Sequence, residues 1–228
     1  MPPFRRSPPP QPPTNPDDWR PQQFGRGLQA IPGAIVEPGW EGVRVLARHE
    51  NGRCRLSDEE GHDCTDEFAA VAEALAAAAR ADDLILDGYL TVQPTQITAG
   101  VPLSTIEAPT PGQMMASMVV GGRAFRPMVS AHPLDPNRPV AFVAVDLLRI
   151  DGSALLDVPL LERKRLLDGS LEPSELIRVT PYVREPLGSF LVSWPGLGFL
   201  SLFFKDPNSR YLPNARNDGW SARPMPVK

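Results

Sequence analysis

The segment VAFVAVDLLRI, residues 140–150, constrains the fold of this chain more than any other stretch. Its apolar residues are too continuous for a strand with one face in water, so it is expected at the centre of a sheet covered on both faces. Asp146 interrupts this run, and a buried carboxylate without a partner is costly. The segment therefore predicts a covered sheet and either a partner or a site for Asp146.

The other regular elements predict an α+β fold built on antiparallel sheets. Residues 43–49 and 53–57 flank an Asn-Gly turn, the strongest short signal for a hairpin. Further strands are expected at 84–92, 176–183 and 197–205, and helices at 65–80, with Thr65 as N-cap, and at 159–169. One more helix is expected to begin at Pro111, inside the long Pro/Gly-rich passage that ends near Pro139.

The N-terminal segment, residues 1–27, differs in composition from the rest. It contains many of the 28 prolines and too few apolar side chains to offset the entropy of ordering it. We predict a disordered Pro-rich arm at 1–27 and a folded domain at 28–228. The run PPPQPP could dock on an aromatic groove, but a passive tail is the favoured interpretation.

The overall charge and cysteine content bound the possible classes of function. The formal net charge of −4 argues against coating nucleic acid by bulk charge, although a local basic groove stays open. The two cysteines, Cys54 and Cys64, predict free thiols rather than a disulfide framework or a zinc site. Without an 18-residue apolar run or a signal-peptide pattern, the expected location is the cytoplasm, with no membrane partner.

Five segments, read in order, resemble the adenylation (nucleotidyltransferase) domain of ATP-dependent DNA ligases and the related mRNA-capping enzymes. EPGWEGVR (37–44) resembles the family's EPKWDGxR, LDGYL (86–90) its LDGEL, and VAFVAVDLLRIDG (140–152) its VAFDLLxLDG. RVTPYV (178–183) is similar to a family strand, and LGFLSLFFKDPNSRYLPNARNDGW (197–220) resembles LGLEGVVAKxxDSPYxPGxRSxxW. The resemblance spans roughly residues 33–224 and implies the ligase and capping nucleotidyltransferase fold.

The resemblance also implies a chemistry, which is adenylyl transfer from ATP through a lysyl–AMP intermediate with Mg²⁺. Such a step needs an uncharged lysine amine, cations around the phosphates and carboxylates for the metal. The nucleophile position is Gly39, and the first lysine of the chain is Lys164. Other matched positions have also lost the family residue, namely Glu59 (arginine in the family), Tyr89 and Leu200 (glutamate), Val145 (the adenine-stacking aromatic), and Ala222 and Pro224 (lysine). We therefore expect no catalytic residues, no metal ligands and no bound ATP or Mg²⁺.

Three residues retain a family identity that implies nucleotide or phosphate binding: Glu37, Arg44 and Lys205. For Arg44 the alternative is an ion pair with Glu37 or Glu41, and for Lys205 it is a solvated strand end. Asp146 also matches the family, and we expect a structural role for it, with backbone amides as its partners.

The favoured hypothesis is a catalytically inactive ligase-like protein that binds nucleic acid or protein, in DNA repair or end joining. One alternative is a nucleotidyltransferase of altered chemistry that uses Lys164, Lys205 or an adenylated partner. Another is a structural assembly subunit whose Pro-rich arm recruits a partner. The chain stops eight residues after Trp220, before the OB-fold with which such ligases continue, so a separate OB-fold protein is a further candidate partner besides DNA and repair proteins.

Overall fold

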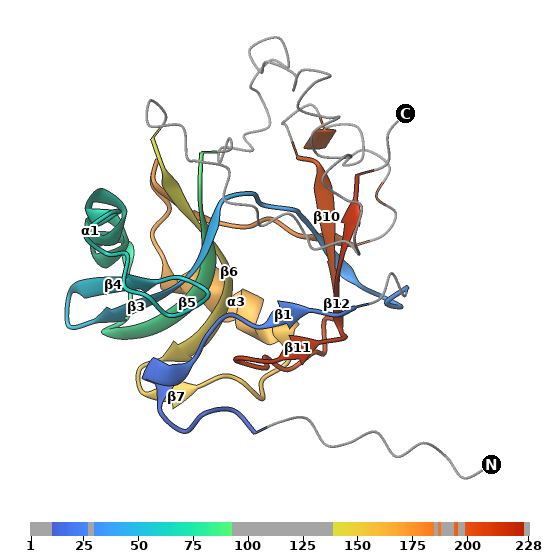
Figure 1. The fold of residues 1–228 in the computed structure, drawn as a ribbon, viewed down its shortest axis with the longest axis horizontal. Coiled ribbons are helices and arrows are strands. Elements are labelled where there is room, and N and C mark those ends of the chain that lie inside the picture. Colours follow the sequence, from blue (N-terminus) through green and yellow to red (C-terminus); the bar gives the residue numbers. More distant parts are fainter. Residues whose placement is uncertain are drawn as a thin grey trace.

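A computed structural model of the chain describes residues 11–26, 30–92, 139–184, 187, 194–195 and 199–225. Two facing sheets dominate this part of the chain (Figure 1). The larger one, here called the central sheet, has the order β4-β3-β5-β6-β7, and β8 pairs with β6 in parallel. Its strands are β3 (Val43–Glu50), β4 (Arg53–Ser57), β5 (Asp83–Thr91), β6 (Ala141–Ile150), β7 (Ser153–Ala154) and β8 (Ile177–Val179).

The second sheet has the order β12-β10-β2-β9, and its three pairings are antiparallel. Its strands are β2 (Ile35–Pro38), β9 (Val183–Arg184), β10 (Ser201–Lys205) and β12 (Trp220–Pro224). A short parallel pair is formed by β1 (Gln23–Phe24) and β11 (Arg216–Asn217). The sequences that supply the two strands of this pair lie at opposite ends of the chain, so the pair ties the N-terminal segment to the region between β10 and β12.

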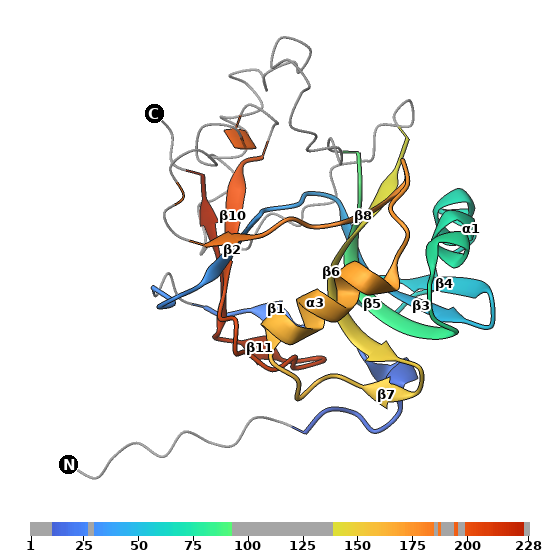
Figure 2. The same cartoon turned by 180° about the vertical axis from the view of Figure 1, so that it is seen from behind.

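Two hydrophobic clusters lie on opposite faces of the central sheet. The first fills the space between the two sheets and includes Val36, Tyr89, Val145 and Phe203. The second lies beneath helix α1 (Ala69–Ala78) and includes Leu75 and Leu86. Helix α3 (Leu160–Ser170) crosses β6 and contributes to both clusters (Figure 2). The strand at 141–150 is therefore covered on both faces, which confirms its predicted place in the sheet.

The predicted hairpin is confirmed. Asn51 and Gly52 both have positive φ, 50° and 76°, as a two-residue turn of this hand requires. The predicted helix start is wrong, because α1 begins at Ala69 after a turn over residues 65–68. The hydroxyl oxygen of Thr65 instead accepts a hydrogen bond from the Leu56 amide at 2.9 Å, and the same hydroxyl donates to Asp63.

The strand predicted at 176–183 is two strands in different sheets, β8 and β9, separated around Pro181. Proline has no amide hydrogen to donate to a ladder, so the chain leaves the central sheet there and joins the second sheet. The strands β11 and β12 lie after residue 205, where the sequence analysis predicted no strand. The helix expected at Pro111 lies outside the described residues.

The N-terminal segment also differs from the expected disordered arm over residues 11–26. It holds a short 3-10 helix, η1 (Pro16–Asp18), capped by the Asn15 side chain, and the strand β1. Trp19 and Phe24 are buried in the cluster between the sheets. Two apolar side chains suffice to order this segment, because they pack into a hydrophobic cluster that the folded domain already forms.

Candidate functional site

The segment matched with the adenylation motif lies at the end of β2, between the two sheets. Gly39 follows that strand, and its amide donates to the Ser201 carbonyl of β10 at 2.8 Å. A Cβ atom placed on Gly39 would overlap the Ser201 hydroxyl and would lie 2.9 Å from the Ser201 carbonyl carbon. Serine replaces the glycine of the family's LEGVVAK at this point. The position of the nucleophile therefore lacks an amine and also lacks the space for a side chain.

Glu37 lies two residues earlier and is held by two lysines. Lys164 Nζ, from α3, is 2.6 Å from Glu37 Oε1, and Lys205 Nζ, from β10, is 2.7 Å from Oε2. All three side chains are at most 1 % exposed. The pKa of Lys205 is lowered to about 8, mainly because the amine is buried; Glu37 opposes this shift, and the charge of Lys164 adds to it. The Lys205 amine also lies 3.9 Å from the centre of the Trp220 ring.

Arg44 belongs to a second buried group. Its Nε and Nη2 donate to the two carboxylate oxygens of Asp87 at 3.0 and 2.6 Å, and Nη1 donates to the Gln22 carbonyl at 2.7 Å. Tyr211 donates its hydroxyl to Asp87 at 2.8 Å. Burial alone would lower the pKa of Arg44, but Asp87 beside it raises that pKa well above the ordinary value. Every guanidinium nitrogen of Arg44 thus has a partner from the chain itself.

Asp146 forms a third buried group, with Arg163 of α3. Arg163 Nε and Nη2 donate to Asp146 at 2.8 and 2.7 Å, and both side chains are fully buried. The Leu147 amide also donates to Asp146 at 2.9 Å. The expected structural role is therefore correct, but a guanidinium supplies more of the bonding than backbone amides do.

Apolar and aromatic side chains surround these groups. Tyr89, at a position where the family has glutamate, is 1 % exposed, and its hydroxyl has no hydrogen-bond partner among the described residues. Burial raises the pKa of Tyr89 above its usual value, and the negative charges of Asp87, Glu59 and Glu37 add to this effect. Val145, at the position of the adenine-stacking aromatic, is buried in the cluster between the sheets.

The structure brings only two of the three expected site residues into contact, Glu37 and Lys205. The alternative interpretation of Arg44, an ion pair with Glu37 or Glu41, names the wrong partner, because Arg44 pairs with Asp87. The alternative for Lys205, a solvated strand end, is also wrong, because its side chain is 1 % exposed. Two partners were not predicted in these roles. Asp87 lies inside the matched segment LDGYL, and Lys164, which the sequence suggested only as an alternative nucleophile, lies in the helix predicted at 159–169.

The described residues around Gly39 do not fit ATP with Mg²⁺. A metal ion needs carboxylate oxygens that are free to coordinate it. Asp87 and Asp146 are each held by an arginine, and Glu37 by two lysines. Elsewhere, on the loop after β4, possible ligand atoms of Asp58, Glu60 and His62 lie within 4.8 Å of one another. Exposed acidic groups of this kind are common without a bound metal.

The two facing sheets, with the motif segment at the end of β2, define a domain of the nucleotidyltransferase class found in DNA ligases. A model of the ATP dependent DNA ligase domain matches residues 27–186. The chain therefore belongs to the ATP-dependent DNA ligase domain family. No helix in the described residues has both the length and the apolar character needed to cross a membrane.

The relatives with known names are DNA ligases and end-joining proteins. A DNA ligase of Methanothrix thermoacetophila is 27 % identical over 210 residues, which cover 87 % of this chain and 34 % of that protein. The multifunctional non-homologous end joining DNA repair protein LigD of Mycobacterium tuberculosis is 28 % identical over 194 residues, 85 % of this chain and 22 % of that protein. The chain thus spans about a third or less of the length of these relatives.

Solved structures show the same fold. The ligase domain of M. tuberculosis LigD superposes with a TM-score of 0.63 at 25 % identity, covering 92 % of this chain and 60 % of that one. The ATP-dependent DNA ligase of bacteriophage T7, in complex with ATP, gives a TM-score of 0.51 at 15 % identity, covering 91 % of this chain and 68 % of that one. The expected fold of antiparallel sheets with flanking helices is confirmed.

Proposed function

We propose that this chain is a ligase-like domain without adenylyl transfer activity, acting as a binding module for nucleic acid or protein in DNA repair or end joining. The proposal rests on the nucleophile position. Gly39 has no amine, and Ser201 leaves no room for a side chain there. Loss of a covalent nucleophile costs on the order of 10⁴- to 10⁶-fold in rate. The end-joining assignment is supported by the names of the LigD relatives.

The state of the remaining charged groups supports the same proposal. Phosphate recognition needs cations that are free to face the ligand. Lys164 and Lys205 both bind Glu37, and Arg44 binds Asp87, so each cation already has a counter-ion inside the protein. A nucleotide would have to displace these carboxylates before it gained any contact with phosphate.

One observation favours the alternative of altered chemistry. Because the pKa of Lys205 is lowered to about 8, a larger fraction of this amine is neutral near neutral pH than for an ordinary lysine. Its environment opposes the same chemistry, since the amine is 1 % exposed and is occupied by Glu37 and the Trp220 ring. We therefore favour the inactive domain.

Adenylation can be tested directly with α-labelled ATP and Mg²⁺, followed by denaturing electrophoresis. An active DNA ligase is the positive control, and Lys205→Met and Lys164→Met are the matched variants. The expected result is no protein-bound AMP in wild type or variants. A labelled band that disappears in only one variant would establish the altered chemistry and overturn the proposal.

Binding can be tested by thermal unfolding with ATP and with nicked duplex DNA in separate experiments. A ligand that binds only the folded state raises the unfolding midpoint by mass action. A flat response to ATP is expected. A rise with nicked duplex at low salt would identify nucleic acid as the partner, whereas no rise would leave protein as the partner class.

A further inference from the structure

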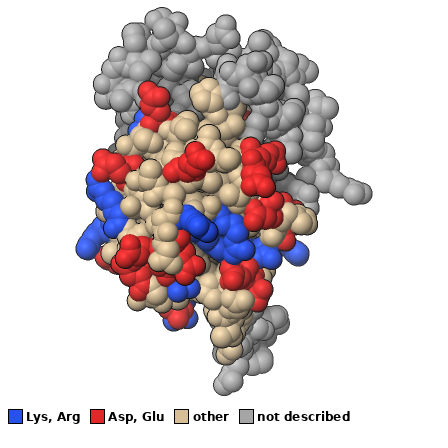
Figure 3. Space-filling model, turned by 90° about the vertical axis from the view of Figure 1, so that its left-hand side faces the viewer, with Lys and Arg blue, Asp and Glu red and all other residues tan. Residues whose placement is uncertain are grey.

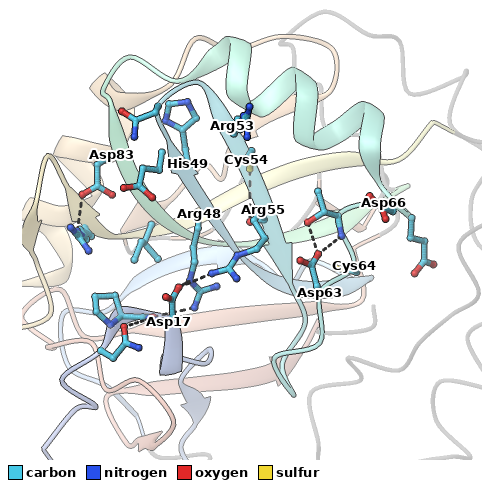
Figure 4. A pocket seen from close by; sticks show the side chains of 18 residues that line it. Asp17, Arg48, His49, Arg53, Cys54, Arg55, Asp63, Cys64, Asp66 and Asp83 are labelled. Atoms are coloured by element: carbon cyan, nitrogen blue, oxygen red, sulfur yellow. Dashed lines mark hydrogen bonds and ion pairs between the residues drawn. The ribbon is translucent and has the colours of Figure 1, made fainter.

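A groove runs beside the hairpin of β3 and β4, away from the buried residues around Gly39. Its volume is about 1410 Å³, and its lining includes His49, Arg48, Arg55, Asp17 and the acidic residues of the 63–67 turn. In Figure 4, Asp63 and Asp66 lie at one end and Asp83 at the other, with Arg48, Arg55 and Asp17 between them. Figure 3 shows the corresponding face, where a band of Lys and Arg is bordered by Asp and Glu.

The arginines at the centre and at one end of this groove have acidic partners. Arg55 Nη2 is 2.6 Å from Asp17 Oδ1, and Arg48 Nε is 3.8 Å from the same oxygen. Arg149 Nε is 2.7 Å from Asp83 Oδ2. Because Arg48 and Arg55 share one carboxylate, these three pairs leave one positive charge over.

Four of the acidic residues that line the groove have no ion pair with a described residue, namely Glu50, Asp63, Asp66 and Glu67. Asp63 accepts hydrogen bonds from Thr65. Arg53 is the one lining arginine in the same state. Because unpaired carboxylates outnumber unpaired guanidinium groups, the free charge of the groove is negative and favours a basic ligand.

His49 provides an independent sign of a ligand. The residue is 5 % exposed, and neither ring nitrogen has a hydrogen-bond partner among the described residues. Arg48 Nε, 3.8 Å from the nearest carboxylate, also lacks a hydrogen bond. Buried polar atoms normally have partners, and a peptide main chain supplies both the acceptor and the donor that an imidazole needs.

The strand next to the groove also suits a protein ligand. β4 is the edge strand of the central sheet, and only part of its outer side is covered within the described chain. The 63–65 turn binds Leu56 and Ser57, through the Cys64 amide, the Thr65 hydroxyl and a bridge to Asp63. Toward Arg53 the edge borders the groove, and extended peptides often bind at such exposed edges.

We propose that this groove binds an extended, positively charged protein segment, whose basic side chains meet Glu50, Asp66 and Glu67 and whose main chain reaches His49. This inference rests on the proposed function, because it names the partner class of the binding module. Nucleic acid is disfavoured at this surface, since its phosphates would face the same three carboxylates.

The test is a fluorescence anisotropy titration with a labelled short peptide of alternating arginine and serine. The binding variant is Glu50→Gln/Asp66→Asn/Glu67→Gln. The matched control, Glu162→Gln/Asp168→Asn/Glu175→Gln, removes the same charge outside the groove lining. Wild type and control are expected to bind alike at low salt, and the binding variant about tenfold more weakly.

His49→Phe separates a ligand-binding role from a structural one. Phenylalanine keeps a ring of similar shape and removes both nitrogens, so the thermal midpoint should hold or rise while peptide affinity falls. Undetectable binding by wild type, equal affinities of the two triple variants, or tighter binding of a nicked duplex than of the peptide would each overturn the proposal. These outcomes leave the adenylation assay unaffected, so failure of the groove is distinguishable from failure of the inactive-ligase proposal.

Discussion

The contact between Gly39 and Ser201 predicts that a side chain at position 39 destabilises the protein. Gly39 is not among the glycines with positive φ, so the cost of Gly39→Ala comes from overlap with Ser201 rather than from backbone strain. Overpacking a close contact costs about 1–3 kcal/mol. For a chain of this size, 2 kcal/mol corresponds to a fall in Tm of roughly 4–8 °C.

Ser201→Gly should relieve much of this cost. The substitution removes the hydroxyl and the Cβ atom, which are two of the three atoms that a Cβ on Gly39 would meet, although glycine in a strand costs about 0.5–1 kcal/mol by itself. The double variant Gly39→Ala/Ser201→Gly should therefore be more stable than the sum of the single effects implies. We expect a coupling of about 1–2 kcal/mol in its favour.

Denaturant unfolding of the four members of this cycle measures the coupling. Gly169→Ala in α3 is the control, because a Cβ there meets nothing within 4 Å and alanine should be neutral or stabilising. Additive effects within about 0.5 kcal/mol would refute the steric argument. The same argument predicts that Gly39→Lys alone forms no lysyl–AMP and seals no nick, and robust sealing by that single variant would refute it as well.

Three further predictions concern the buried titratable groups. The pKa of an unfolded lysine is about 10.4. With a folded pKa of about 8, Lys205 loses its proton at a lower pH in the native state than in the unfolded state. Its contribution to stability therefore rises with pH between about 8 and about 10, and the stability difference between wild type and Lys205→Met should grow in favour of wild type across that window. Because burial raises the pKa of Cys54 to about 12 and that of Cys64 to about 11, native thiols should react with a disulfide reagent at least about 100-fold more slowly than urea-unfolded thiols near pH 8. Glu37→Gln should cost about 3–5 kcal/mol in unfolding free energy, whereas the apolar triple Glu37→Leu/Lys164→Met/Lys205→Met should be neutral or stabilising; equal losses in the two would contradict the ion-pair account.

The sequence predicted the strands whose patterns are local. The hairpin follows from Asn51-Gly52, and β6 follows from its continuous apolar run. The sequence analysis failed where an element far away in the sequence determines the surroundings of a side chain. Lys205 was expected to bind phosphate or, as the alternative, to be a solvated strand end, but the missed strand β12 pairs with β10 and sets Trp220 opposite Lys205.

The pairing of Arg44 was accessible in principle. The antiparallel register of β3 and β5 places Arg44 opposite Tyr89 and Leu46 opposite Asp87, so Arg44 and Asp87 are diagonal neighbours on one face. The order of the two strands in the sheet was the missing information. The triad at Glu37 was less accessible, because Lys164 comes from a helix and Lys205 from another strand, far away in the sequence.

These internal pairings explain why one substitution should not restore a ligase site. A phosphate would compete with Glu37 for the amines of Lys164 and Lys205. The Glu37 oxygens lie 2.6 and 2.7 Å from these two amines, and the carboxylate is fully buried. Freeing Lys205 therefore means breaking one of the two buried ion pairs that hold Glu37, and that cost would offset the new contact. A lysine at position 39 would add a further positive charge beside a triad that already holds two. Recognition of a partner is consequently easier to place on the outer surface than among buried charges that already bind one another. On that surface Glu50, Asp66 and Glu67 are exposed and have no ion pair within the described part of the chain.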